Sequence, residues 1–586
     1  MKMVNATINH INITVEENTS ILKAAKKFGL NIPTLCFYED LNIKSDCRVC
    51  VVEVEGRKGL VASCSTPIKE GMVIYTNSPR VINARKTIVE LILANHDTNC
   101  ATCVKNMRCE LQNLAKTLGI DQNRFPSVLQ KCDIDDHNPC LVRNPNLCIK
   151  CGRCVDVCSI IQGTSVLSIL GRGHETRVSA VFDEPLSENF CTFCGQCASV
   201  CPVGAITEKD DTDVVWKALT DHNKHVIVQV APAVRVSLGE EVGLKAGTIV
   251  TGKIVSAMKL LGFDRVFDTD FTADLTIIEE GNELIDRITN NGVLPMMTSC
   301  CPGWINYAET RYPDILDHIS SCKSPQQMFG ALAKSYYPKQ AGIDPSDVFV
   351  VSVMPCTAKK YEAKRDEMKV NKEYPDIDAV LTTRELGKMI KQMGIDFENL
   401  EETDFDSPFG ITTGAAAIFG ATGGVMEAAI RTVYEVVNQK PLEKMDFKEL
   451  RGLNGIKEAD INLGGSTVKV AVAHTLSMAK ILCDQVRAGT SPYTFIEIMT
   501  CPGGCIGGGG QPYGTTNQIR QNRIDSTYVV DANMKFRKSH ENPEVVALYE
   551  NFLKEPLGDL SHHLLHTHYH DRHHEEQKNA YDEGNH

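Results

Sequence analysis

The hydrophobic pattern of the chain changes from short alternating stretches near the N-terminus to fully apolar runs separated by helical segments further on. Residues Ala6 to Val15 alternate between apolar and polar side chains, which indicates a hairpin, and Thr19 to Phe28 has helical spacing. From about residue 210, apolar runs such as Val226 to Val230 and Val348 to Val353 alternate with helical stretches such as Gly252 to Leu261. This alternation predicts a large α/β domain that follows a small β-rich one.

Three apolar runs of the large domain lead directly into cysteine-containing segments. They are Val293 to Met297, Val348 to Val353 and Thr494 to Met499. Ligands of an open parallel sheet lie beyond the carboxyl ends of its strands, so the cysteines after these runs are expected to meet in one crevice. The cysteines that would meet there are Cys301, Cys356, Cys501 and Cys505. Four thiolates suit a 4Fe-4S cluster, and Cys300 is left as a spare thiol beside it.

The composition of the chain points to metal binding inside a reducing compartment. Among 586 residues there are 24 cysteines, which fall in tight clusters. Residues Met1 to Glu16 lack the apolar core of a signal peptide, and no apolar run reaches the roughly 18 residues of a membrane span. These features predict a soluble, cytoplasmic, metal-binding protein without a membrane segment. The net charge of −13 argues against binding to nucleic acid.

The first 80 residues combine a β-rich pattern with four cysteines. These are Cys36, Cys47, Cys50 and Cys64. A 2Fe-2S cluster needs two thiolates for each iron, so the segment predicts a ferredoxin-like β-grasp domain with such a cluster. A zinc site is the alternative for the same four side chains.

The next segment, residues 81–125, has a helical pattern and carries one histidine among three cysteines. The four residues are His96, Cys100, Cys103 and Cys109. If His96 and Cys100 lie four positions apart on one helix, both face the same side and reach one metal. An isolated histidine is more often a satisfied core or surface residue, but the three nearby cysteines favour ligation.

Residues 126–210 contain two CxxCxxCxxxC runs, which are typical of bacterial ferredoxins with two 4Fe-4S clusters. In such runs the fourth cysteine of each binds the other cluster. One predicted set is Cys148, Cys151, Cys154 and Cys201, and the second is Cys158, Cys191, Cys194 and Cys197. Cys132 and Cys140 fit neither set and are interpreted as structural or free thiols.

Three segments of the large domain resemble the signature segments of the iron-iron (FeFe) hydrogenases. They read TSCCPGW at Thr298 to Trp304, MPCTAKK at Met354 to Lys360 and MTCPGGC at Met499 to Cys505. The resemblance implies a catalytic domain over residues 211–560 that interconverts H2 with protons and electrons at an H-cluster. It further implies a 4Fe-4S cluster joined through Cys505 to a di-iron unit with carbonyl, cyanide and azadithiolate ligands, which maturation factors would install.

The same resemblance assigns roles to residues around this cluster. Lys359 would donate a hydrogen bond to a cyanide, although without the resemblance it is simply a surface lysine. The residues that would line a water-poor pocket are Ala231, Pro232, Gln326, Met354 and Met499.

A proton relay is implied as well. The resemblance makes Cys300 the terminal proton donor, with a thiol expected to titrate near neutrality. Its further members would be Glu280, Glu283, Ser320 and Arg287. By composition alone, Glu279, Glu280 and Glu283 would be an ordinary solvated acidic helix.

Electrons would pass through four accessory clusters, one 2Fe-2S and three 4Fe-4S, one of the latter with a histidine ligand. The N-terminal domain resembles that of long hydrogenases and of the large iron-sulfur subunit of respiratory complex I, and offers a docking surface for a flavin- and NAD(P)-binding partner subunit. The sequence has no dinucleotide fingerprint of its own. The segment 564–569 resembles the ending of subunits from NAD(P)-linked hydrogenase complexes, some of which bifurcate electrons between ferredoxin and NAD.

The last residues, 561–586, are rich in histidine. They include His562, His563, His566, His568, His570, His573 and His574. Metal binding is one interpretation, and a solvated, partly helical tail is the favoured one.

Several other functions compete with the NAD(P)-linked hydrogenase. They are a stand-alone ferredoxin hydrogenase, a non-enzymatic hydrogenase-like iron-sulfur assembly protein, a hydrogen sensor and a complex I-type subunit. An assembly protein would lack the proton relay and the cluster-bearing N-terminal region, and a sensor would replace Cys300. A complex I-type subunit would explain only the first 210 residues.

Overall fold

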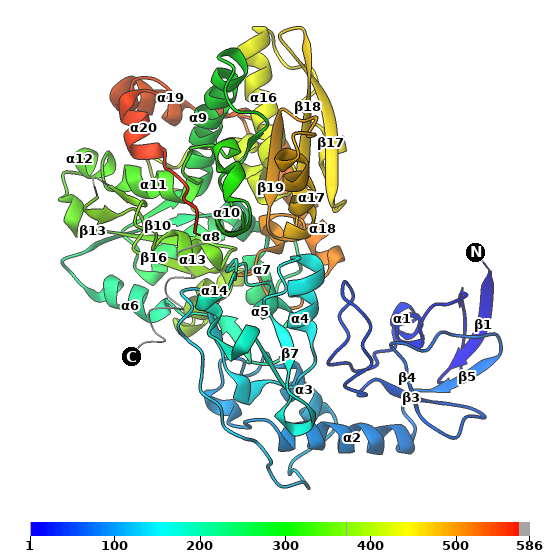
Figure 1. The fold of residues 1–586 in the computed structure, drawn as a ribbon. Helices are drawn as coiled ribbons and strands as arrows, with labels where there is room; N and C mark the ends of the chain where they lie inside the picture. Colours follow the sequence, from blue (N-terminus) through cyan, green and yellow to red (C-terminus); the bar gives the residue numbers. More distant parts are fainter. Residues whose placement is uncertain (1, 371, 573–586) are drawn as a thin grey trace.

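The computed structural model describes residues 2–370 and 372–572, so His573 and His574 of the predicted tail lie outside the described residues. The N-terminal domain projects from the side of the main body (Figure 1). Its sheet has the strand order β2-β1-β5-β3-β4, in which β1 and β5 are parallel. The elements are β1 (Met3–Ile8), β2 (Ile11–Glu16), α1 (Ile21–Lys27), β3 (Val51–Val54), β4 (Val61–Ala62) and β5 (Met72–Tyr75). The predicted hairpin and helix are therefore present, the helix two residues shorter at its start and one at its end.

A long helix, α2 (Pro79–Ala94), leads from this domain into the ferredoxin-like region. Residues 81–125 form α2 and the short α3 (Glu110–Thr117) with irregular chain between them. The argument that His96 and Cys100 share a helix face is therefore wrong, because α2 ends at Ala94. The ferredoxin-like region contains β6 (Leu141–Arg143), α4 (Arg153–Asp156), β7 (Ser168–Leu170), β8 (Arg177–Ser179), α5 (Gln196–Val200) and β9 (Ile206–Glu208).

The large domain is built around two four-stranded sheets. The first is parallel, with the order β11 (Arg265–Asp268), β10 (His225–Val230), β13 (Val348–Met354) and β16 (Ala379–Thr382). The second has the order β12 (Met296–Met297), β19 (Phe495–Met499), β18 (Ser466–His474) and β17 (Ile456–Leu463), in which only β17 runs antiparallel to its neighbour. The three cysteine-delivering strands therefore belong to two sheets rather than to one.

The run Val293 to Met297 forms a strand only at its last two residues. Val293 and Leu294 are partly exposed, at 44% and 37% of their surface. Pro295 has no N–H for a ladder hydrogen bond, so pairing with β19 begins after it. The predicted strand was therefore too long by three residues, although its end leads to the cysteines as expected.

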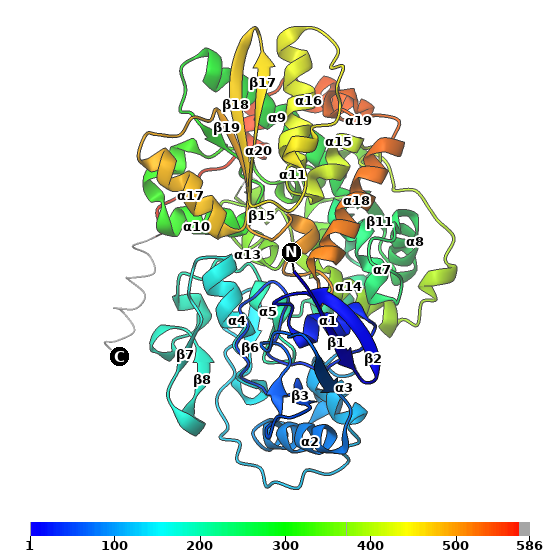
Figure 2. The same cartoon turned by 90° about the vertical axis from the view of Figure 1, so that its right-hand side faces the viewer.

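Helices cover both sheets (Figure 2). They are α6 (Thr212–Thr220), α7 (Leu238–Glu241), α8 (Thr251–Leu261), α9 (Thr269–Thr289), α10 (Pro302–Arg311), α11 (Pro325–Ala333), α12 (Tyr337–Ala341), α13 (Ala358–Glu362), α14 (Thr383–Gln392), α15 (Gly414–Ala417), α16 (Gly424–Asn438), α17 (Leu476–Arg487), α18 (Asn517–Asn533), α19 (Pro543–Leu548) and α20 (Asp559–Leu565). Among the described residues, no helix is both long enough and apolar enough to cross a bilayer.

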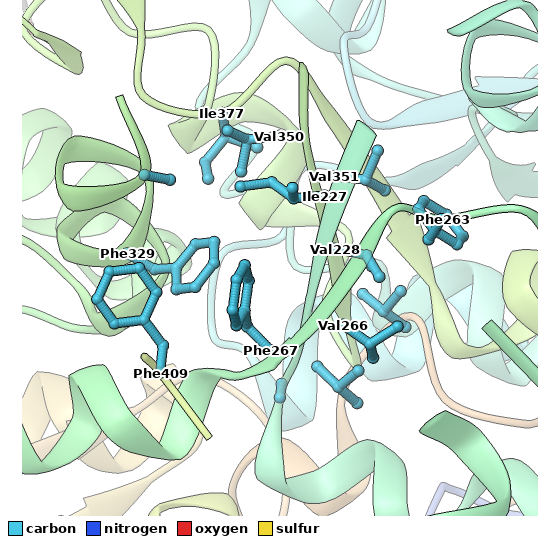
Figure 3. Packing of buried hydrophobic residues seen from close by; sticks show 14 of the residues in the cluster. Ile227, Val228, Phe263, Val266, Phe267, Phe329, Val350, Val351, Ile377 and Phe409 are labelled. Atoms are coloured by element: carbon cyan, nitrogen blue, oxygen red, sulfur yellow. The ribbon is translucent and has the colours of Figure 1, made fainter. Parts of the chain in front are cut away.

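The core of the first sheet fixes α11 against the strands (Figure 3). Phe267 of β11 lies 5.8 Å from the Phe329 ring of α11 and 5.3 Å from the Phe409 ring, measured between ring centroids. All three are buried and pack at tilted or edge-on angles, which are favourable for aromatic rings. This packing holds α11, and with it Gln326, at the end of the sheet where the cysteines gather.

Candidate active site

One buried cavity collects the residues that the sequence assigned to the active site. It measures about 90 Å³ and lies where β10, β13 and β19 end and α10 begins. Its walls include the predicted cysteines Cys300, Cys301, Cys356, Cys501 and Cys505, and the predicted lining residues Ala231, Pro232, Gln326, Met354, Lys359 and Met499. The short segments after each strand are what place these side chains together.

The four cysteines predicted to hold the cluster fit such a group by their chemistry. All four line the same cavity. Burial raises the pKa of the Cys501 thiol well above its ordinary value, and the charges of Cys356 and Cys301 raise it further. The backbone N–H of Thr500 points at the Cys301 sulfur over 3.4 Å, as expected for a donor to a bound thiolate. Gln326 Oε1 is buried in the cavity wall and has no hydrogen-bond partner among the residues that the structure describes.

Gly504 allows the chain to pass close to this cavity. Its φ is +92°, and a Cβ atom there would lie 2.6 Å from the Thr422 nitrogen and 2.8 Å from the Met499 sulfur. A side chain at this position would therefore push Cys505 away from the other three cysteines. A bound H-cluster would supply the metal that binds hydrogen and stores electrons, while the protein holds it and manages the protons.

Lys359 is a buried cation and not a surface lysine. Its ammonium donates hydrogen bonds to both carboxylate oxygens of Glu362, at 2.8 and 3.0 Å, and to the Cys300 carbonyl at 3.1 Å. Burial alone would lower the lysine pKa, but the Glu362 carboxylate outweighs it and raises the pKa. Lys359 therefore stays charged beside the cysteine turn. Glu362 was not predicted as a site residue. Its position three residues after Lys359 on one helix could have indicated the ion pair between the two side chains.

The predicted relay residues lie together behind Cys300. Ser320 Oγ donates to Glu283 Oε2 at 2.7 Å, and Arg287 Nη2 donates to Glu283 Oε1 at 2.7 Å. Glu280 is 2% exposed, and none of the described residues forms a hydrogen bond with its Oε1. The solvated acidic helix is therefore the wrong interpretation of α9, because Glu279, Glu280 and Glu283 are all buried.

The electrostatics of this group favour neutral acids near the cavity. Burial and the charge of Glu283 raise the pKa of Glu280 to about 8, so it is mostly protonated at pH 7. Burial, followed by the charges of Glu280 and Cys301, raises the pKa of the Cys300 thiol well above its ordinary value. The expectation that Cys300 titrates near neutrality is therefore wrong, and the residue is a neutral S–H donor.

The two ferredoxin-type cysteine sets each surround a small cavity. One cavity is lined by Cys148, Cys151, Cys154 and Cys201, and the other by Cys158, Cys191, Cys194 and Cys197. In each group, three cysteines come from one run and the fourth comes from the other run, as predicted. Of the two leftover thiols, Cys132 is exposed and Cys140 is buried.

The N-terminal cysteines associate in pairs. The sulfurs of Cys50 and Cys64 are 3.4 Å apart, and Cys36 and Cys47 are hydrogen-bonded and shift each other's pKa. A pairwise arrangement suits a 2Fe-2S cluster, in which each iron takes two thiolates.

His96 has the properties of a ligand although it does not lie on the predicted helix face. It is buried, its Nδ1 has no hydrogen-bond partner in the described part of the chain, and burial lowers its pKa, so the ring is neutral with a free lone pair. Burial raises the pKa values of both Cys100 and Cys109, and the charge of Cys103 raises both further. Cys103 and Cys109 pack in the same hydrophobic cluster.

The beginning of the histidine-rich tail packs against the relay. Leu564 to Thr567 is buried, so the interpretation of a solvated tail is wrong for these residues. His566 Nε2 lies 3.2 Å from Glu279 Oε2, and its Nδ1 lies 2.8 Å from Ser321 Oγ. These contacts were not predicted, because nothing local in the sequence links residue 566 to residue 279.

Family models match nearly the whole chain. A 2Fe-2S iron-sulfur cluster binding domain matches residues 1–79, an NADH-ubiquinone oxidoreductase-G iron-sulfur binding region 85–124, and a 4Fe-4S dicluster domain 147–205. The C-terminal domain of the iron only hydrogenase large subunit matches residues 224–509, and the iron hydrogenase small subunit matches 517–572.

Curated relatives and solved structures agree with these matches. The chain is 48% identical to the NADP-reducing hydrogenase subunit HndD of Solidesulfovibrio fructosivorans, over 97% of this chain and 99% of the relative. It is 42% identical to iron hydrogenase 1 of Clostridium pasteurianum, over 97% and 100%. The structure of a variant of the HydA1 FeFe hydrogenase from Chlamydomonas reinhardtii is 43% identical, with a TM-score of 0.57 over 62% of this chain and 99% of that one. The predicted multi-domain α/β fold is thereby confirmed, and the chain belongs to the FeFe hydrogenases, the enzymes that oxidise and produce H2 at an H-cluster.

Proposed function

We propose that this chain is the catalytic subunit of an NAD(P)-linked hydrogenase complex, in which protons pass through Cys300 and electrons through four accessory clusters. The observation that carries the catalytic part is the convergence of four cysteines, Cys300 and Lys359 on one buried cavity. One side of that cavity leads to buried carboxyl groups, and the other leads to the ferredoxin-like region.

The proton route follows from the order of acids behind the cavity. Cys300 is a neutral thiol, and Glu280 is a carboxyl with a pKa of about 8, so each holds a proton near neutral pH and passes it on without a large change in charge. Ser320 bonds to Glu283, and Arg287 ties Glu283 to the partly exposed end of the route. These groups move protons between the cavity and the solvent.

The electron route is supported by the close joint between the ferredoxin-like region and the active-site loops. Gln196 Nε2 donates to the Gly507 carbonyl at 2.9 Å, and Ser199 Oγ donates to the Gly509 carbonyl at 3.2 Å. A Cβ atom on Gly195 would lie 3.2 Å from the Gly509 Cα, so the backbones nearly touch. A cluster held by Cys194 would therefore be the neighbour of the catalytic one, and the other accessory clusters would extend the route toward the projecting N-terminal domain (Figure 1).

The link to NAD(P) rests on two likenesses. The relative that matches the chain from end to end at 48% identity is named as a subunit of an NADP-reducing hydrogenase. Residues 85–124 match an iron-sulfur region of NADH-ubiquinone oxidoreductase. Because this chain has no dinucleotide fingerprint, a partner subunit binds flavin and NAD(P), and ferredoxin is the second acceptor in a bifurcating cytoplasmic complex. The second candidate is a stand-alone ferredoxin hydrogenase, which the 42% identity to iron hydrogenase 1 over nearly the whole chain favours.

The test is anaerobic purification of the native protein together with the subunits that accompany it. Hydrogen uptake is then assayed with NAD(P)⁺ alone, with oxidised ferredoxin alone and with both together. Reduction of both acceptors only when both are present supports the bifurcating complex. Full activity of the single chain with ferredoxin alone supports the stand-alone enzyme, and no hydrogen uptake under any condition contradicts both.

A further inference from the structure

The C-terminal segment brings a histidine to the proton relay. Lys323 N donates to the Leu565 carbonyl at 2.7 Å, and Thr567 N donates to the Ser321 carbonyl at 2.8 Å. This antiparallel bridge places His566 opposite Cys322. Cys322 is fully buried and His566 nearly so, and neither belongs to a predicted cluster. Two potential metal ligands therefore lie beside the relay without a role in it.

These two residues form a set of three donors together with Glu283. One ligand atom from each of Glu283, Cys322 and His566 lies within 4.8 Å of the other two. The Cys322 sulfur is 3.8 Å from Glu283 Oε2. In a tetrahedral zinc site the ligand atoms are about 3.3 to 3.8 Å apart, given metal-ligand distances of about 2.0 to 2.3 Å. A small contraction therefore suffices to close the three donors around an ion.

The groups behind these donors already orient them. His566 Nε2 faces Glu279 Oε2 at 3.2 Å, so a proton on Nε2 is held by a carboxylate, as in most histidine-metal sites. The Nδ1 lone pair accepts from the Ser321 hydroxyl at 2.8 Å, so this hydroxyl must turn away before Nδ1 binds an ion. Arg287 binds Glu283 Oε1, whereas Oε2 accepts from Ser320 Oγ at 2.7 Å and faces the Cys322 sulfur at 3.8 Å. Glu279 and Arg287 therefore hold the His566 ring and the Glu283 carboxylate by the atoms that do not bind the ion.

The charge around the site favours a cation. Two carboxyl groups lie beside it: Glu283 is hydrogen-bonded to the cation Arg287, and Glu279 pairs with His566. Ligation replaces the thiol proton of Cys322 by the ion and releases that proton to the solvent, with no change of oxidation state. The partly exposed Arg287 side chain, 15% accessible, marks the approach from the surface.

We propose that Glu283, Cys322 and His566 form an inhibitory site for a thiophilic divalent cation of the zinc class, which takes Glu283 out of the proton relay when it binds. The inhibitory effect rests on the proposed relay, whereas the binding itself does not. Borderline ions such as Zn²⁺ match the mixed set of sulfur, nitrogen and carboxylate oxygen, and Mg²⁺ does not.

The test compares the holoenzyme with two cysteine variants, all under anaerobic conditions and all with the histidine-rich tail intact. Cys322→Ser removes the sulfur donor but keeps a hydroxyl of similar size, and Cys483→Ser removes another fully buried thiol in a different core cluster. Hydrogen production from a reduced dye is measured against ZnCl2 concentration. We expect half-inhibition of Cys322→Ser to need at least about tenfold more zinc than the parent and Cys483→Ser, with recovery after addition of a chelator. His566→Gln should shift in the same direction as Cys322→Ser.

Zinc-edge X-ray absorption of the same samples shows where the ion binds. We expect one zinc-sulfur contact at about 2.3 Å in the parent and none in Cys322→Ser. Zinc bound to the tail histidines contributes equally to both spectra and does not affect this comparison. Equal inhibition of the parent and Cys322→Ser would overturn the proposal, and so would the absence of this sulfur contact. A zinc-sulfur contact without inhibition would keep the metal site and refute the relay through Glu283. A zinc-free enzyme without activity would contradict the proposed function instead.

Discussion

Replacement of Glu280 by glutamine separates its proton-transfer role from its effect on stability. The side chain is buried, its Oε1 lacks a hydrogen-bond partner within residues 2–370 and 372–572, and its pKa is about 8. Glutamine has nearly the same shape as the protonated carboxyl but cannot release and regain the proton. Loss of a positioned acid-base group costs about 10²- to 10⁴-fold in rate, so hydrogen production from a reduced dye should fall by that factor in Glu280→Gln.

The same substitution should increase stability, with a defined dependence on pH. The pKa of Glu280 rises from an ordinary value of 4.5 to about 8 on folding, so between these values the folded state binds more protons than the unfolded state. Stability of the parent therefore falls as pH rises through this window, by about 1.4 kcal/mol for each pH unit. Between pH 5 and pH 7 the advantage of Glu280→Gln over the parent should grow by about 2.5 kcal/mol, measured as slower amide hydrogen exchange along α9.

Glu279→Gln is the matched control for this prediction. Glu279 is also buried on α9, but hydrogen bonds from His566 and Tyr549 outweigh its burial and lower its pKa. Its carboxylate is therefore charged and paired, and the amide should destabilise α9 near neutral pH instead of stabilising it. The reasoning is refuted if Glu280→Gln turns over at the parent rate, or if its exchange advantage stays the same from pH 5 to pH 7.

Three further substitutions test separate parts of the site. Cys300→Ser should nearly abolish turnover and leave the infrared and paramagnetic signals of the clusters in place, and full activity would remove its proton role. Cys501→Ala should prevent retention of the active-site cluster, so an intact active-site spectrum would contradict the ligand assignment. Gly195→Ala adds a Cβ atom at a φ of +67° and 2.4 Å from Thr357 Oγ1. It should slow electron delivery from ferredoxin several-fold but keep H2/D2O exchange, and loss of both in equal measure would contradict the electron route.

The sequence predicted the cysteine chemistry because cysteine spacing is a local property. The two ferredoxin-type runs fixed their own ligand sets, and the structure brings the same cysteines around two cavities. The three signature segments likewise contain the cysteines of the catalytic cavity, together with Met354, Lys359 and Met499. The arrangement of the strands could not be predicted as well from the sequence. β12 and β19 pair with each other in one sheet, whereas β13 belongs to another. Pairing between segments about 200 residues apart leaves no periodic signal.

The environment of charged side chains was the least predictable part. Lys359 and the glutamates of α9 are residue types that usually lie on a protein surface. Tertiary packing buries them here and gives each one a partner or a shifted pKa. The helix argument for His96 failed because α2 ends at Ala94, yet the buried ring with a free Nδ1 still suits a ligand. His566 was interpreted as part of a solvated tail, since its partners Ser321 and Glu279 lie more than 240 residues away in sequence.

The central claim is that Cys300 carries protons between the buried cavity and the carboxyl groups behind it. The most direct measurement is isotope exchange by the cofactor-loaded enzyme under H2 in D2O, without any electron acceptor. The account predicts rapid formation of HD and D2 by the parent and almost none by Cys300→Ser, although both retain the same cluster spectra. Equal exchange by the two proteins would show that protons reach the cavity by another route.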